Sequence, residues 1–250
     1  MDSVSKRVRR RDLFQVFWRL LFLQGLLHPK GMQNLGLMNS LAPALRGRKR
    51  SDGKPLLLNY IRFFNCNPNF TPLIVGGILR LESEREAGKP VTEEDIEYFQ
   101  KAISGPMAAM GDLLFLGGLK PLALTLACIF AIYKSLIGLL AVVLLYNLVV
   151  VSCRLWGVYF GYAKGWELVD VFSGPAFQRL LGVVQNVGAC ASGALVAVVI
   201  SRLPQGGTWS LPLGIFLMVA AVFMLRRDVS SSRLAIFLFP LSVLVALLSG

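Results

Sequence analysis

Apolar residues form long, nearly uninterrupted blocks in the second half of the chain. Short polar or basic segments separate five such blocks, at residues 113–133, 136–153, 183–201, 211–225 and 234–249. A helix needs about 20 predominantly apolar residues to cross a bilayer. The pattern therefore predicts an all-α membrane protein, a polytopic helical bundle with about five transmembrane helices over residues 113–249.

The N-terminal part, residues 12–45, has a different pattern. In residues 12–27 (DLFQVFWRLLFLQGLL) the helix surface is apolar except for one narrow stripe of polar residues, Asp12, Gln15 and Arg19. Asp12 is the predicted N-cap. Because this stretch is short for a full span, we expect an amphipathic interfacial or re-entrant helix. The weakly apolar stretch from Met32 to Leu45 follows.

Residues 60–112 combine a short apolar run with an aqueous segment. FFNCNPNF (Phe63 to Phe70) places asparagines and a proline between aromatic residues. Pro72 to Leu81 is apolar but too short to cross the membrane, which predicts a re-entrant segment. Thr92 and Asp95 match a capping box. The helical spacing of apolar residues then predicts an amphipathic cytoplasmic helix through Ile96, Phe99 and Ile103.

Charge refines this picture. The chain is 55% hydrophobic and 16% charged, with a net charge of +12, whereas soluble domains have about 25% charged residues. A basic chain is a candidate for nucleic-acid binding, but here Lys and Arg lie beside apolar blocks, as in cytoplasmic loops of membrane proteins. We expect no nucleic-acid partner. Counting Lys and Arg places the N-terminus, residues 46–104 and the loops 154–182 and 226–233 in the cytoplasm.

Two charged residues lie at or within the first apolar span, in the segment Gly105 to Pro121 (GPMAAMGDLLFLGGLKP). Asp112 and Lys120 are eight residues apart and therefore near one helical face. The surrounding helix-breaking residues predict a broken helix of the kind that builds transporter sites: Gly105, Pro106, Gly111 and Pro121. Asp112 is either a ligand or an interfacial N-cap, and both interpretations stay open. For Lys120, pairing with a carboxylate of another subunit is favoured over a ligand role.

The sequence offers little for catalysis. His28 is the only histidine, so a catalytic triad or a histidine-based metal cluster has few residues to draw on. A phosphoryl-acceptor role is the alternative, but HPKG is better explained as a turn. There is no nucleotide-binding loop, and the four cysteines lack metal-ligand spacing. We expect no cofactor, no metal and no catalytic residue.

Five sequence blocks follow one another in a distinctive order. They are FWRLLFLQ with MQNLG, FFNCNPNFTPLIVGGILRLE, ISGPMAAMGDLLFLGGLKP, YNLVVVSCRLWGVYFGYAKG and the apolar C-terminal third. Together they resemble the IID membrane component of the mannose/fructose/sorbose family of the bacterial phosphotransferase system (PTS). That family typically shows FFNTNP-like, GPLAGxGD and GYxKG blocks in this order. The resemblance covers most of the chain and implies a single membrane domain over residues 1–250.

The resemblance implies a sugar-transport subunit of the bacterial cytoplasmic (inner) membrane, with several spans and a cytoplasmic N-terminus. Such a IID chain pairs with a IIC membrane subunit in a hetero-oligomer within the lipid bilayer. Cytoplasmic IIA and IIB proteins relay phosphate between histidines, and IIB phosphorylates the sugar as it is translocated. IID chains carry no phosphorylated residue, which agrees with the single histidine.

The resemblance also implies roles for residues of the matched blocks. Asn65 is the expected sugar ligand, because a neutral amide offers donors and an acceptor without the cost of burying a charge. Asn67 and Asp112 are further candidates, although Asn67 is also explained as a backbone cap. Pro68 is expected to break a helix, and Cys66 to fill space.

The chain departs from the family pattern just before MQNLG. Where relatives usually have Asn-x-Glu-Arg, this chain has His28, Pro29, Lys30 and Gly31. The region between Ile200 and Leu211 is also shorter than usual. These departures motivate an alternative function, a degenerate IID homologue with a regulatory or receptor role in a PTS-like complex.

Overall fold

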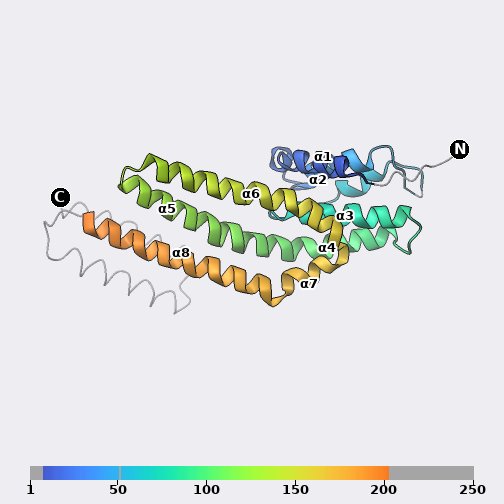
Figure 1. Cartoon of the computed structure of the whole chain (residues 1–250). Coiled ribbons are helices and arrows are strands. Elements are labelled where there is room, and N and C mark those ends of the chain that lie inside the picture. Colours follow the sequence, from blue (N-terminus) through green and yellow to red (C-terminus); the bar gives the residue numbers. More distant parts are fainter. Residues whose placement is uncertain (1–7, 51, 203–250) are drawn as a thin grey trace. The chain divides into compact units, whose positions relative to one another are not determined.

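The structure, a computed structural model, describes residues 8–50 and 52–202. Within these ranges the chain is helical and contains no β-strand (Figure 1), which confirms the all-α fold class. Contacts divide the chain into two compact units, Met1–Gly193 and Ala194–Gly250. The predicted spans 211–225 and 234–249 lie outside the described residues, so the number of spans and the single domain stay predictions.

The N-terminal region forms two helices, α1 (Arg10–Leu20) and α2 (Asn34–Leu45), and two 3₁₀ helices, η1 (Leu23–Leu26) and η2 (Leu56–Ile61). α1 packs against α2, and α2 against η2. The predicted N-cap at Asp12 is wrong. The helix begins at Arg10, two residues before Asp12. The Asp12 carboxylate accepts a hydrogen bond from the backbone N–H of Arg9 at 2.9 Å. A carboxylate in the first turn thus pairs with a free backbone donor and interacts favourably with the helix dipole.

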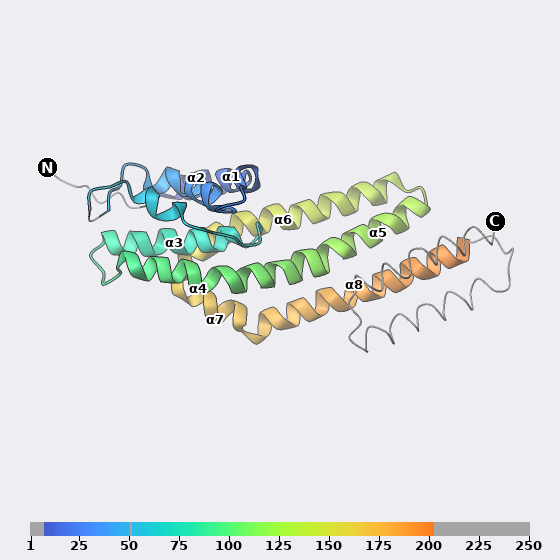
Figure 2. The same ribbon diagram turned by 180° about the vertical axis from the view of Figure 1, so that it is seen from behind.

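α3 (Thr71–Glu86) and α4 (Glu93–Gly111) form a helical hairpin. In two opposite views α3 runs between the α1–α2 pair and α4 (Figures 1 and 2). The predicted short segment from Pro72 to Leu81 is thus part of a longer helix. The first nine residues of α3 are all buried. The capping box of Thr92 and Asp95 is confirmed, because each backbone N–H donates to the other side chain, at 2.8 and 3.1 Å.

The predicted break between Gly105 and Pro121 is wrong. The chain stays helical from Glu93 to Ile132, through a π-helix, η3 (Asp112–Leu119), into α5 (Lys120–Ile132). Pro121 falls in the first turn of α5, where the wider π-type hydrogen bonding changes back to α. A proline inside a helix lacks an N–H donor, and its ring crowds the carbonyl four residues earlier. Both effects fall where the bonding pattern changes, so the helix continues.

Beyond α5, the chain turns at Tyr133–Ser135 into α6 (Leu136–Lys164), followed by η4 (Gly165–Glu167), α7 (Leu168–Ser173) and α8 (Pro175–Arg202). Figure 1 shows α5 and α6 side by side as a hairpin. In the described part of the chain, two helices are long and apolar enough to cross a membrane, Glu93–Ile132 and Leu136–Glu167. Few side chains in their apolar stretches are buried, as expected for helices that face lipid.

Among the described helices, α3 and α6 make the most extensive contact, and glycines permit their close approach. A Cβ atom on Gly161 of α6 would lie 2.1 Å from the carbonyl oxygen of Leu73, and one on Gly76 of α3 would lie 2.3 Å from that of Val158. Neither position has room for a side chain. Small residues let helix backbones approach in this way in membrane proteins, where dispersion contacts replace the hydrophobic effect.

We predict that Gly161→Ala destabilises the fold by about 1–3 kcal/mol, because the new methyl group forces α3 and α6 apart. Thermal unfolding of the detergent-solubilised full chain measures this. Gly105→Ala is the matched control. Gly105 is helical and exposed, with open space around its Cβ position, so this change is neutral or stabilises by up to about 1 kcal/mol. Equal unfolding temperatures for the two variants would contradict the close contact.

Candidate functional site

The segment Phe63–Phe70, here called the asparagine loop, connects η2 to α3 and has an irregular backbone. A buried glutamine on the adjacent turn, Gln33, satisfies that backbone. Its Nε2 donates to the carbonyl of Cys66 at 2.8 Å, and its Oε1 accepts the N–H of the same residue at 3.2 Å. The backbone N–H of Gln33 donates to the carbonyl of Phe64 at 2.8 Å. These bonds hold the loop as a neighbouring strand would.

Asn67 joins the loop to the start of the π-helix. Its Nδ2 donates to Asp112 Oδ1 at 2.8 Å, while its Oδ1 accepts the N–H of Asn69 at 2.9 Å. Both hydrogen-bonding groups of this buried amide are thereby used. The approach requires Gly111, since a Cβ atom there would lie 2.4 Å from the Asn67 Cβ. Asn67 therefore caps the loop backbone and positions a carboxylate.

Asn69 and Phe70 attach the end of the loop to the remaining helices. Arg154 of α6 donates from Nε to the buried Asn69 Oδ1 at 2.8 Å. The Phe70 ring packs against three further rings, with centroid distances of 5.2 to 6.1 Å: Phe115 of η3, Phe172 of α7 and Phe177 of α8. One short loop is thus held by contacts from α2, η3, α6, α7 and α8.

Asn65 differs from the other two asparagines of the loop. It is exposed, and the structure gives its side chain no hydrogen-bond partner among the described residues. Asn67 and Asn69 are buried and bonded, so the backbone on either side of Asn65 is held in place. The loop thus presents one free amide, and the Asp112 carboxylate that Asn67 holds is also exposed. Neutral amides and carboxylates together suit a hydroxyl-rich ligand.

The structure brings part of the predicted residue set together. Asn65, Asn67 and Asp112 lie in the asparagine loop or against it, with Gly111 at the contact. Pro68 lies in the turn that precedes α3. This turn is closed by a hydrogen bond from the Phe70 N–H to the Asn67 carbonyl at 2.9 Å. The proline therefore shapes a turn and does not break a helix.

The other predicted residues lie elsewhere. Gly105 and Pro106 are on the exposed face of α4, and Pro121 is in α5. Lys120 is exposed and has no ion pair within the described residues, so its pairing with another subunit stays a prediction. No sequence pattern indicated the roles of Gln33 and Asn69, although Gln33 lies in the MQNLG block and Asn69 in the FFNCNPNF block.

The HPKG departure lies beside the loop and forms a closed turn, as predicted. His28 and Met32 exchange two backbone hydrogen bonds, at 3.1 and 2.8 Å. The His28 Nε2 lies 2.7 Å from Asn34 Oδ1, and Met32 forms a backbone bridge with Phe64 of the loop. The altered residues thus keep a turn that supports the loop.

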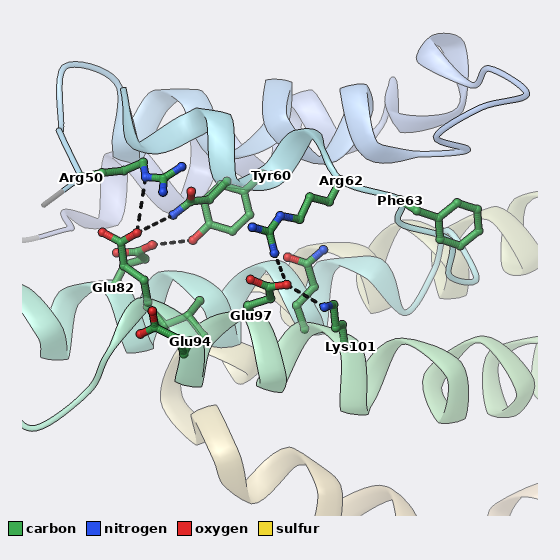
Figure 3. Close-up of a pocket in the computed structure, with 12 residues that line it drawn as sticks. Arg50, Tyr60, Arg62, Phe63, Glu82, Glu94, Glu97 and Lys101 are labelled. Carbon is green, nitrogen blue, oxygen red and sulfur yellow. Dashed lines mark hydrogen bonds and ion pairs between the residues drawn. The ribbon is translucent and has the colours of Figure 1, made fainter. Parts of the chain in front are cut away.

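A second polar cluster lies between η2, α3 and α4 (Figure 3). The Tyr60 hydroxyl donates to Glu82 Oε1 at 2.5 Å, and Arg85 bridges Glu82 and Glu93 at 2.9 and 2.8 Å. Burial raises the pKa of Glu82, against the hydrogen bond from Tyr60 and the charge of Arg85. The hollow beside it holds about 90 Å³, whereas ligand pockets usually hold about 300 Å³ or more. This cluster joins helices and is not the ligand site.

Exposed apolar helices and a buried polar loop with one open amide define a helical membrane protein of the transport class. A family model described as "PTS system mannose/fructose/sorbose family IID component" matches residues 7–203. The chain therefore belongs to the IID family of mannose-type PTS permeases and is a membrane component of a PTS sugar-transport system, as its sequence blocks predicted.

Individual relatives agree with this assignment. The mannose-specific EIID component of Escherichia coli (strain K12) is 32% identical over 197 residues, which cover 78% of this chain and 70% of the relative. The fructose permease IID component of Bacillus subtilis (strain 168) is 26% identical over 269 residues and 96% of each chain. The cryoEM structure of the mannose transporter ManYZ with microcin E492 contains a chain 27% identical, with a TM-score of 0.60 over 95% of this chain and 96% of that one.

We predict that Gly111→Ala displaces the asparagine loop, because its new methyl group would overlap Asn67. Cys66, which is 3% exposed, then reacts faster with N-ethylmaleimide in the detergent-solubilised full chain, as read by peptide mass spectrometry. An increase on the order of tenfold is expected if the change costs about 1.4 kcal/mol of local stability. Gly117→Ala is the control in the same π-helix, because its Cβ would be 3.7 Å from the nearest atom. Equal labelling rates in both variants would refute the contact.

Glu82→Gln is predicted to change how stability depends on pH. The folded-state pKa of Glu82 lies above its ordinary value of 4.5, so the folded chain binds this proton more tightly than the unfolded chain. Glu82 thus favours folding below pH 4.5, and this contribution is lost as the pH rises through the folded-state pKa. Thermal unfolding between pH 4.5 and 8 will show a smaller decrease in stability for Glu82→Gln than for wild type. Exposed Glu94→Gln retains the wild-type dependence, and an unchanged profile for Glu82→Gln would disprove the effect.

Proposed function

We propose that this chain pairs with a IIC membrane subunit and, with it, binds and translocates a sugar that a cytoplasmic IIB protein phosphorylates. Membership in the IID family supports the proposal, as does the likeness to a chain of the ManYZ mannose transporter. The chain's own part is to bind and orient the sugar. Phosphate reaches the sugar from the IIA and IIB phosphocarriers.

The observation that carries this proposal is the open amide of Asn65 on a loop whose other two asparagine side chains are buried and hydrogen-bonded. A sugar hydroxyl both donates and accepts a hydrogen bond, and a side-chain amide can match both. Because Gln33, Asn67 and Asn69 already hold the loop, little entropy is lost when Asn65 binds a ligand. Asp112, fixed by Asn67, accepts a second hydroxyl.

The loop supplies only one side of such a site. Asn65 and Asp112 are both exposed, whereas a bound sugar loses water around most of its surface. In the proposed complex the IIC subunit covers the opposite side of the sugar. Movement of the covered site across the membrane then releases the sugar where IIB can phosphorylate it.

The arrangement of the first unit supports a cytoplasmic N-terminus. The start of α1 and the α3–α4 turn lie at the same end of this unit (Figures 1 and 2). The basic segment after α2 also reaches that end, since Arg48 pairs with Glu86 at 2.8 Å and Arg50 lies 3.5 Å from Glu93. The α5–α6 turn lies at the other end and carries one basic residue, Lys134. Positive charge collects on the cytoplasmic side of membrane proteins, so we assign the α3–α4 end to the cytoplasm.

Asn65→Ala tests the sugar ligand. The loss of one or two neutral hydrogen bonds, at about 0.5–1.5 kcal/mol each, is expected to raise the KM of phosphoenolpyruvate-dependent sugar uptake about tenfold. Uptake is measured in cells that lack their own mannose-type permease and express this chain with its IIC, IIB and IIA partners. Asn147→Ala is the matched control, since that exposed amide bonds to the Val143 carbonyl of its own helix at 2.8 Å.

The same cells separate binding from assembly. Asn65→Ala should still co-purify with the IIC subunit at the wild-type ratio, because its exposed side chain makes no hydrogen bond to a described residue. Wild-type uptake by Asn65→Ala would remove this residue from the site. Unchanged uptake after deletion of the whole chain would refute the transport function itself.

A further inference from the structure

α1 has two apolar faces, and only one of them packs against the protein. Val16, Phe17 and Leu20 are buried against the rest of the unit. On the opposite side Phe14 and Trp18 are 53% and 57% exposed, and their rings stack with centroids 6.5 Å apart. A soluble surface rarely exposes such a patch without a partner. In a membrane component this aromatic face requires an apolar occupant.

Four arginines surround a hollow at the start of the same helix. It has a volume of about 240 Å³ and is lined by residues at the start of α1, at the end of α2 and in the segment after α2. Arg9, Arg11 and Arg46 are exposed, and the described residues give them no ion pair. Arg48 also lines the hollow and pairs with Glu86 at 2.8 Å. The only carboxylate in the lining is Asp12, which accepts the backbone N–H of Arg9.

The basic hollow and the aromatic face are neighbours. A second hollow, of about 410 Å³, is lined by Phe14, Gln15, Trp18 and Arg19. Gln15 lines both hollows, so the two share a wall. Arg19 is held in place by Asn39, to whose backbone oxygen and Oδ1 it donates at 3.0 and 3.1 Å. A cationic cavity therefore adjoins an aromatic one along a single helix.

We propose that these two hollows form a binding site for an anionic phospholipid, with the phosphate among the arginines and an acyl chain over Phe14 and Trp18. Guanidinium groups bind phosphate oxygens through paired, charge-assisted hydrogen bonds. The surplus of positive charge selects an anionic headgroup over a zwitterionic one. A free phosphate would leave the aromatic face uncovered, whereas a phospholipid fills both hollows. The site is separate from the sugar loop, and neither proposal depends on the other.

Brominated lipids test the site, because bromine on an acyl chain quenches a tryptophan that it contacts. The full chain is reconstituted in phosphatidylcholine vesicles with increasing fractions of dibrominated phosphatidylglycerol. The quenching that is lost in Trp18→Phe reports this site alone. We expect it to saturate at a low fraction of phosphatidylglycerol, and dibrominated phosphatidylcholine at the same fraction to leave Trp18 unquenched.

Charge variants distinguish a site from general attraction. The combination Arg9→Gln, Arg11→Gln and Arg46→Gln is expected to raise the half-saturating fraction on the order of a hundredfold, at about fivefold for each basic residue. The matched control, Arg10→Gln, Lys30→Gln and Lys49→Gln, removes the same charge from exposed residues outside both hollows and is expected to change it less than about threefold.

Four results would overturn the proposal. The first is an equal loss of phosphatidylglycerol binding in the two charge variants. The second is quenching of Trp18 by dibrominated phosphatidylcholine as strong as that by dibrominated phosphatidylglycerol, and the third is no quenching of Trp18 by either lipid. The fourth is displacement of phosphatidylglycerol by millimolar inorganic phosphate, which would assign the basic hollow to a free anion. Circular dichroism of each variant confirms that the fold is intact before binding is compared.

Discussion

The rest of the structure depends on the contact between the backbones of α3 and α6. Gly161 and Gly76 leave no side chain between the two helices, so α6 passes directly over the first turns of α3. That position allows Arg154, two turns before Gly161 on α6, to reach Asn69 in the loop that begins α3. A wider separation would leave a guanidinium and a buried amide unpaired, each at a cost of about 1–3 kcal/mol.

Polar groups in this protein are used in two different ways. Around the asparagine loop, side-chain amides bond the backbone, the Asp112 carboxylate and the Arg154 guanidinium, and the exposed Asn65 amide and Asp112 carboxylate are the groups proposed to bind a ligand. Between η2, α3 and α4, charged groups neutralise one another around the buried Glu82. In the first arrangement, a rigid loop keeps one side-chain amide without a hydrogen-bond partner among the described residues. In the second, the charged groups pair with one another and hold the helices together. This difference separates the proposed ligand site from a structural network.

Several features of the chain were predictable because they depend on neighbours in sequence. The capping box at Thr92, the turn at HPKG and the buried stripe of Ile96, Phe99 and Ile103 are local patterns, and all three are present. The predicted break before Pro121 failed because glycine and proline content shows only that a regular α-helix is costly there. It does not show that eight residues of π-helix can absorb the change.

The sequence by itself determined the all-α membrane class, the family and the block that carries the proposed site, since hydropathy, helical period and motif order are properties of the chain. Only the tertiary structure decided what each asparagine of that block does. Asn65, Asn67 and Asn69 are chemically identical, and their roles differ because Asp112 and Arg154 come from helices 45 and 85 residues away. Such long-range pairings follow from the packing of α3, α6 and η3, which no local pattern specifies.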